Sequence, residues 1–339
     1  MILVFVETDG SGATEASLET VTFARDLATR ETGDGGGGPV HAVVVGALPD
    51  GTVEALGAHG VNEVHHATGE AFSAYGGAVW AAAIQAAQRA TGSVAVTATG
   101  SPRGNEVLAH LAARLGVAMA ANVVGCPTPF ALAQPFEVGR PFVVSRQVVG
   151  GAVLEEMRLD DRPAVFSVAG HAVEGAPAAS PVTATLHEFF PEVAEADLVA
   201  RVVSTEPGEP DRSGSLRSAR VVVGAGRGAG SADGFDDVVE LAGLLHGSLG
   251  VSRVVTSLGW RPHHEQVGQT GSRISPELYI PCGISGAIQH WAGCASSKTI
   301  LAINTDPDAP MMTRATYAVI GDMHEVVPAI NEEIRRRRG

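Results

Sequence analysis

Residues 278–306, which read LYIPCGISGAIQHWAGCASSKTILAINTD, constrain the fold of this chain more than any other stretch. Two short apolar runs, 278–280 and 299–303, are expected to be buried strands. Between them, a turn at Gly283 is followed by a helix of about ten residues. A strand, a helix and a second strand in this order form a right-handed βαβ unit, which predicts a parallel sheet.

The same stretch carries groups that suit an anionic ligand. Ser285 and Gly286 stand where the helix is expected to open, and unpaired backbone N–H groups at such an end attract phosphate. Gln289 and His290 follow on the first turns of this helix. Asn304 ends the next strand, at the edge where open α/β sheets bind ligands. Together these residues predict a nucleotide-like ligand.

The first 200 residues alternate strand and helix in the same way. Their periodicity predicts strands at 2–7, 40–45, 63–66, 93–97 and 165–168, and helices at 14–30, 52–59, 77–91 and 104–115. Between 125 and 162, prolines and short β-like runs indicate antiparallel additions at a sheet edge. Residues 1–203 are therefore expected to form an α/β domain with a mostly parallel sheet.

A second domain is expected after a linker. Residues 204–218, STEPGEPDRSGSLRS, lack a hydrophobic period and are rich in Pro, Gly, Ser and charge, which is typical of a linker. Beyond them, strands are expected at 221–223, 253–256, 278–280, 299–303 and 317–320, and helices at 237–249 and 323–337. Residues 219–339 should thus form a doubly wound, flavodoxin-like or Rossmann-like domain.

The charge balance and the cysteines restrict partners and compartment. Acidic residues outnumber basic ones by 37 to 23, a net charge of −14, which argues against a nucleic-acid partner. The basic run 335–338 is expected to be a solvated helix end rather than a binding patch. Three cysteines without CxxC spacing, no signal sequence before the first strand and no apolar segment of spanning length predict a cytoplasmic, non-membrane protein.

Two glycine-rich segments of the second domain carry further candidate contacts. Residues 224–230, GAGRGAG, differ from a dinucleotide fingerprint because Arg227 stands in the middle and no acidic ribose anchor follows. They fit either a backbone nest beside a cation, suited to pyrophosphate, or a plain glycine turn. The long loop 257–276 offers Gln269 and Thr270, which suit a heteroaromatic ligand. For Trp260 and Arg261 the pattern does not decide whether they lie on the surface or contact the ligand.

Neither a metal site nor a catalytic residue is expected. The pairs His65/His66 and His263/His264 have no nearby cysteine or matched carboxylate set, and adjacent histidines on a strand point to opposite faces. Ser285 lacks a GxSxG elbow and His290 lies on its own helix, which argues against a hydrolase triad.

With these motifs assembled, the chain resembles the alpha subunit of electron transfer flavoproteins. The resemblance lies in residues 221–227, 250–253, 266–271, 278–290 and 298–310, with the family's motifs in the same order and spacing. It implies an electron carrier rather than an enzyme, with one FAD in the C-terminal domain and an N-terminal domain that contacts a beta subunit. Arg227 and the 285–287 turn would hold the pyrophosphate, and Asn304, Asp322 and Met323 the adenosine part.

The resemblance also implies how the flavin ring is held. Ser252 and Arg253 would lie against the isoalloxazine, and Thr270 would hydrogen-bond near N5. Gln289 and His290 would approach the pyrimidine end, where negative charge accumulates on reduction. Cationic and donor groups there would raise the flavin potential. The full set assigned to FAD is Arg227, Ser252, Arg253, Val267, Gly268, Gln269, Thr270, Ser285, Gly286, Ala287, Ile288, Gln289, His290, Asn304, Asp322 and Met323.

The partners implied are a beta subunit, flavin dehydrogenases such as acyl-CoA dehydrogenases of fatty acid beta-oxidation, and a membrane quinone oxidoreductase. The beta subunit would carry AMP, or a second FAD if the heterodimer is an electron-bifurcating form that oxidises NADH. Two other classes remain: a nicotinamide-dependent dehydrogenase, for which no acidic ribose anchor or acid/base is found, and a non-redox nucleotide-binding regulator, which would be colourless.

Overall fold

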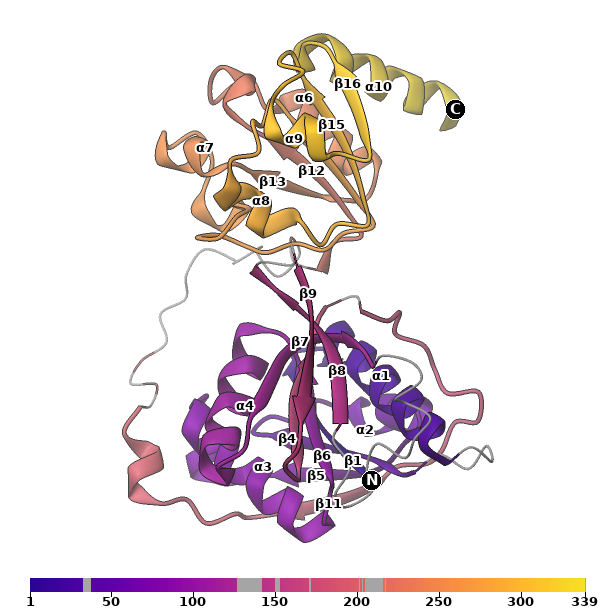
Figure 1. The fold of residues 1–339 in the computed structure, drawn as a ribbon, viewed down its shortest axis with the longest axis vertical. Helices are drawn as coiled ribbons and strands as arrows, with labels where there is room; N and C mark the ends of the chain where they lie inside the picture. Colours follow the sequence, from indigo (N-terminus) through magenta and orange to yellow (C-terminus); the bar gives the residue numbers. More distant parts are fainter. Residues whose placement is uncertain are drawn as a thin grey trace. The chain divides into compact units, whose positions relative to one another are not determined.

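The computed structural model describes residues 1–32, 38–126, 142–149, 153–170, 172–200, 202, 204, 216 and 218–338. The chain divides into two compact units, Met1–Val148 with Leu154–Glu206, and Val149–Val153 with Pro207–Gly339. Most of the expected linker 204–218 falls outside the described residues. Each unit contains its own sheet, as Figure 1 shows.

The first unit is built on a nine-stranded sheet of order β11-β5-β4-β1-β6-β10-β7-β8-β9. Its parallel strands are β1 (Ile2–Phe5), β4 (Val40–Val45), β5 (Val61–Ala67), β6 (Ala95–Thr99), β7 (Met119–Gly125), β10 (Ala164–Val168) and β11 (Thr185–Phe189). β8 (Phe142–Val148) pairs antiparallel with β7, and β9 (Val153–Leu159) lies beyond it. β2 (Thr8–Asp9) and β3 (Gly12–Ala13) form a separate small hairpin.

Two helical layers cover this sheet, one on each face (Figure 1). Side chains of α1 (Glu15–Thr32) and α2 (Thr52–Ala58) pack with Val4, Val44 and Phe166 in one core. Those of α3 (Gly77–Thr91) and α4 (Pro102–Leu115) pack with Leu3 and Val43 in the other. The central strands are apolar on both faces because both faces are covered.

The second unit is a five-stranded parallel sheet of order β13-β12-β14-β15-β16. The strands are β12 (Val221–Ala225), β13 (Ser248–Val251), β14 (Leu278–Cys282), β15 (Thr299–Asn304) and β16 (Tyr317–Ile320), and the helices are α6 (Asp236–Leu244), α7 (Arg253–Ser257), α8 (Ile288–Cys294), α9 (Pro310–Arg314) and α10 (Met323–Arg338). The strand order 2-1-3-4-5 is the flavodoxin-like doubly wound order. The fold class expected from the sequence is thus confirmed for both units.

Three expected elements of the second unit are wrong in detail. Residues 253–256 are not a strand but lie in the short helix α7, and the strand is β13, five residues earlier. The helix expected to run to 249 is α6, which ends at Leu244. α8 begins at Ile288 after an N-cap at Ala287, so it has seven residues, and Ser285 and Gly286 belong to the preceding turn.

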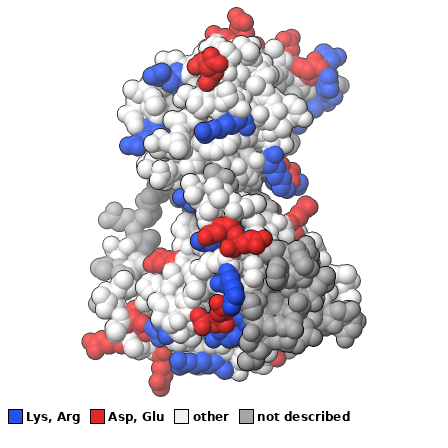
Figure 2. All heavy atoms as spheres, in the orientation of Figure 1, with Lys and Arg blue, Asp and Glu red and all other residues white. Residues whose placement is uncertain are grey.

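Charges of both signs are interspersed on the face drawn in Figure 2, without a continuous basic surface. The four C-terminal arginines lie on α10, and three of them form ion pairs. Arg335 pairs with Glu240 of α6, and Arg336 and Arg337 pair with Glu333 of α10. Among the described helices, none combines the length and the apolar content needed to cross a bilayer.

Candidate functional site

The candidate FAD residues gather at one edge of the second sheet. Because its five strands are parallel, the segments after them all leave from the same edge. Arg227 follows β12, Ser252 and Arg253 follow β13, and the 283–288 turn follows β14. β12 and β14 are neighbours, although the chain visits β13 between them, so the strand order reverses at this point. Open α/β sheets bind ligands at such a reversal.

Close glycine contacts hold the loops after β12 and β14 together. The N–H groups of Gly226 and Gly228 donate to the carbonyls of Cys282 and Gly283 over 3.0 and 3.2 Å. A Cβ on Gly226 would lie 2.4 Å from the Gly283 oxygen, and one on Gly228 would lie 2.7 Å from the Gly283 Cα. Gly283 itself has φ +59, which favours glycine. Close backbone packing therefore requires glycine at positions 226, 228 and 283. The Arg227 side chain, which lies between these contacts in the sequence, is exposed at the edge.

The 266–272 loop is clamped against α8. The N–H of Gln269 donates to the Gln289 carbonyl over 2.8 Å, and that of Ile274 donates to Gly293 over 2.7 Å. A Cβ on Gly293 would lie 2.4 Å from the Gly268 backbone, so the two segments touch through glycines. This contact brings Val267, Gly268, Gln269 and Thr270 beside Gln289 and His290.

Gln266 is a positioning residue that the sequence analysis did not assign. It is 3% exposed. The Thr256 hydroxyl donates to its Oε1 over 2.6 Å, and its Nε2 donates to the Thr270 hydroxyl over 2.9 Å. This relay ties α7, which carries Arg253, to the loop that carries Thr270. The sequence signal was its place at the start of the QVGQTG motif.

His290 is buried and hydrogen-bonded within the domain. It is 7% exposed, and its Nε2 lies 2.8 Å from the hydroxyl of Tyr279. Tyr279 lies across Gly224, where a Cβ would come within 2.6 Å of the phenol oxygen. Burial lowers the pKa of His290 to about 4, against a small opposing effect of the Val267 backbone, so the ring is neutral at pH 7. Burial also raises the pKa of Tyr279, which keeps its proton.

The other ring nitrogen of His290, Nδ1, is buried and makes no hydrogen bond of good geometry, although the Val267 backbone lies close enough to raise the pKa of the ring slightly. Such atoms are rare in folded proteins and call for a partner. The segments at this edge also carry donors whose side chains make no hydrogen bond or ion pair to another described residue: the exposed Arg227, Arg253, Gln269, Ser285 and Gln289, and the half-buried Ser252. Two guanidinium groups with hydroxyl and amide donors fit a ligand that joins phosphates to a heteroaromatic ring.

The remaining assigned residues occupy the ends of β15 and β16. The Asn304 amide donates to the Ile284 carbonyl over 3.2 Å, so it braces the 283–288 turn. Asp322 accepts from the N–H of His324 over 2.9 Å at the start of α10. Met323 is 4% exposed and packs in the core. Ala287 and Ile288 are exposed, whereas Gly286 is buried against Met311.

Trp260 and Arg261, which the sequence left open, have partners within the domain. Trp260 packs against the core, and Arg261 forms a two-point ion pair with Glu265 over 2.6 and 2.7 Å. The His263/His264 pair lies on a 3-10 turn, His263–Glu265.

Comparison with known proteins identifies the family of this chain. Residues 2–192 match the electron transfer flavoprotein domain, and residues 215–295 match the electron transfer flavoprotein FAD-binding domain. An electron transfer flavoprotein subunit alpha of Mycobacterium leprae is 33% identical over 99% of both chains. One of Mycobacterium tuberculosis is 36% identical over 100% of this chain and 99% of its own. One of Paracoccus denitrificans is 39% identical over 56% of this chain and 60% of its own.

The donors without protein partners at the carboxyl edge fit the phosphates and the heteroaromatic ring of the FAD that the matched domain binds. The chain therefore belongs to the alpha subunits of electron transfer flavoproteins, electron carriers whose C-terminal domain binds FAD.

Proposed function

We propose that this chain, as a heterodimer with a beta subunit, holds FAD at the carboxyl edge of β12–β16 and accepts electrons from flavin dehydrogenases such as acyl-CoA dehydrogenases. It passes them on to a membrane quinone oxidoreductase. The observation that supports this most is the set of donors without protein partners at that edge. FAD supplies the one- and two-electron chemistry, and the residues of the chain set its position and its potential.

Arg227 and the 285–287 turn are proposed to hold the pyrophosphate. They stand on the two sides of the strand-order reversal, and glycine contacts fix their loops to one another. A guanidinium binds phosphate oxygens in a two-point geometry, and exposed backbone N–H groups of a turn add donors. Asn304 would keep this turn in place, and Asp322 would contact the adenosine part together with the backbone around Met323.

Arg253 is proposed to supply a positive charge beside the flavin ring. Its guanidinium is exposed and has no carboxylate partner among the described residues, so no neighbouring charge cancels its field. A fixed cation favours the reduced, negatively charged ring over the neutral oxidised ring and thereby raises the potential. The hydrogen bonds of Gln266 to Thr256 and Thr270 would fix the position of α7, and so of Arg253, relative to Thr270.

His290 is proposed to act as a neutral hydrogen-bonding group rather than as a cation. With Tyr279 as donor to Nε2, the proton of the imidazole resides on Nδ1, which faces the Val267 backbone and is proposed to donate also to the pyrimidine end of the flavin. Tyr279 thus selects the tautomer, much as a carboxylate does for a metal-bound histidine.

The test is the midpoint potential of the heterodimer with Arg253→Gln. Loss of an interaction of about 1 kcal/mol with the reduced ring lowers a one-electron potential by about 40 mV. Arg220→Gln is the matched control, since it removes the same charge at the amino end of β12, where Arg220 pairs with Glu277 over 3.1 Å. An Arg253→Gln potential equal to that of the Arg220→Gln control contradicts the proposed role.

The flavin content of the heterodimer tests the shuttle itself. One FAD with one AMP, and reduction by a flavin dehydrogenase, supports the proposal. Two FAD with bleaching by NADH would instead indicate the bifurcating form.

A further inference from the structure

Three histidines and one glutamate meet on the first sheet, far along the chain from the FAD residues. They come from three neighbouring parallel strands: His41 on β4, Glu63 and His65 on β5, and His187 on β11. In the strand register His41 is opposite Glu63, and His187 is opposite His65. Registered residues of parallel strands point to the same face, as do residues two apart on one strand. All four side chains therefore lie on one face. It is the face that α3 and α4 cover, because Val43 and Ala67, two residues from His41 and His65, pack against those helices.

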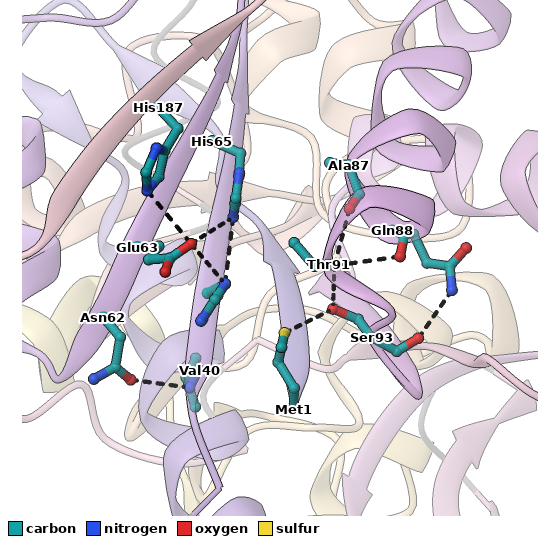
Figure 3. A network of polar contacts seen from close by, with 11 residues as sticks. Met1, Val40, Asn62, Glu63, His65, Ala87, Gln88, Thr91, Ser93 and His187 are labelled. Atoms are coloured by element: carbon teal, nitrogen blue, oxygen red, sulfur yellow. Dashed lines mark hydrogen bonds and ion pairs between the residues drawn. The ribbon is translucent and has the colours of Figure 1, made fainter.

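The distances among three of them are those of metal ligands. His41 Nδ1 lies 3.3 Å from His65 Nε2, and Glu63 Oε2 lies 3.5 Å from the first and 3.4 Å from the second. Figure 3 shows Glu63 between His65 and His187, with contacts to both. A triangle with edges of about 3.4 Å has its centre about 2.0 Å from each corner, which is the usual Zn–N and Zn–O bond length.

Hydrogen bonding explains these separations less well. A charge-assisted bond between imidazolium and carboxylate is about 2.7–2.9 Å long, shorter than each Glu63 contact here.

We propose that His41, Glu63 and His65 bind one divalent transition-metal ion of the zinc class. Two imidazole nitrogens and a carboxylate oxygen suit Zn²⁺ and its neighbours in the first row, whereas Mg²⁺ and Ca²⁺ prefer all-oxygen sites. His187 Nε2 lies 3.5 Å from Glu63 Oε2 and orients that carboxylate. The side chains of Glu63 and His187 are 39% and 48% exposed, so the fourth position is open to water and to metal entry.

The location indicates a structural ion rather than a catalytic one. His41 is the second residue of β4, near the amino end of the sheet, whereas ligand crevices of such sheets lie at the carboxyl end. β11 is an exposed edge strand that pairs with β5 alone. The ion would join β4 to β5 directly and fasten β11 through His187 and Glu63.

The test uses the full-length, untagged chain with its partner subunit, freed of metal and titrated with Zn²⁺ against a chromophoric chelator. We expect one tight Zn²⁺ per chain, lost in Glu63→Gln and His65→Gln and weakened roughly 10- to 100-fold in His187→Gln. The matched control is His110→Gln, which removes an exposed histidine of α4 and should leave binding unchanged. An unchanged far-UV circular dichroism spectrum of each variant verifies that the first unit, which carries the substitutions, has folded.

Thermal unfolding provides a second readout. Saturating Zn²⁺ should raise the Tm of the wild-type protein and of His110→Gln but not that of Glu63→Gln, because only the first two bind the ion in the folded state. Equal Zn²⁺ affinity in wild type and His65→Gln, or displacement of Zn²⁺ by a modest excess of Mg²⁺, would overturn the proposal. The three histidines would then be a ladder of stacked rings, with neighbouring centroids 5.5 Å apart.

Discussion

The burial of His290 makes the FAD-binding domain sensitive to acid. The pKa of this side chain is about 4 in the folded domain, against a usual value of 6.5, because burial penalises its charged form. Between these two values the unfolded chain binds a proton that the folded chain does not, so stability falls as the pH falls. At 1.36 kcal/mol for each unit of pKa difference, the loss is about 2 kcal/mol between pH 7 and pH 5 and approaches about 3 kcal/mol below pH 4.

The measurement is denaturant unfolding of the flavin-depleted protein at pH 7, 6 and 5, followed by tryptophan fluorescence. Two of the three tryptophans, Trp260 and Trp291, lie in this domain. His290→Gln keeps a group that can bond to Tyr279 but takes up no proton. Its stability should therefore change with pH by about 2 kcal/mol less than that of the wild type, while histidines common to both proteins cancel. Parallel pH curves for the two proteins would refute the reasoning.

Two further predictions concern backbone and charge. Gly286→Ala should destabilise the second unit by about 1–3 kcal/mol and reduce FAD content, because Gly286 has φ +77 and its Cβ would lie 2.6 Å from Met311 N. Gly230→Ala is the control, because Gly230 has the same φ but open space around its Cβ. An equal loss of FAD in Gly230→Ala would show that the contact of residue 286 with Met311 does not cause the loss. Asp197→Asn should cost about 1–3 kcal/mol in denaturant unfolding, since this carboxylate is 8% exposed and pairs with Arg114. The exposed pair Arg158–Asp160 is the control, and Asp160→Asn should stay within about 0.5 kcal/mol.

Sequence patterns predicted those parts of the fold that local hydrophobicity determines. β12, β14, β15 and β16 are apolar runs bounded by turns, and their ends correctly predicted which residues stand at the carboxyl edge. β13, SLGV, is short and half glycine or serine, so hydrophobicity favours a strand at the two valines after it instead. In the structure Val255 is buried and Val254 is 45% exposed, as one turn of helix requires.

The parts that could not be predicted depend on contacts between distant residues. The Tyr279–His290 hydrogen bond and the Gln266 relay depend on how β14, α8 and the 266–272 loop pack against one another, and no local sequence pattern encodes that packing. Likewise His41, His65 and His187 are brought together by strand order, since β11 lies beside β5 although well over a hundred residues separate them. β11 escaped prediction because TLHEF is mostly exposed and offers no buried run.

The position of β11 also has a consequence for synthesis of the chain. β11 follows β10, which lies in the interior of the sheet, yet it pairs at the far edge beside β5. Until residues 185–189 leave the ribosome, β5 presents an unpaired edge with Val61 and Val64, which invites pairing with other chains. This late, long-range pairing should be a slow step in folding. The nascent first unit is therefore most prone to aggregation in the interval before β11 arrives, and a chaperone that shields β5 would act in that interval.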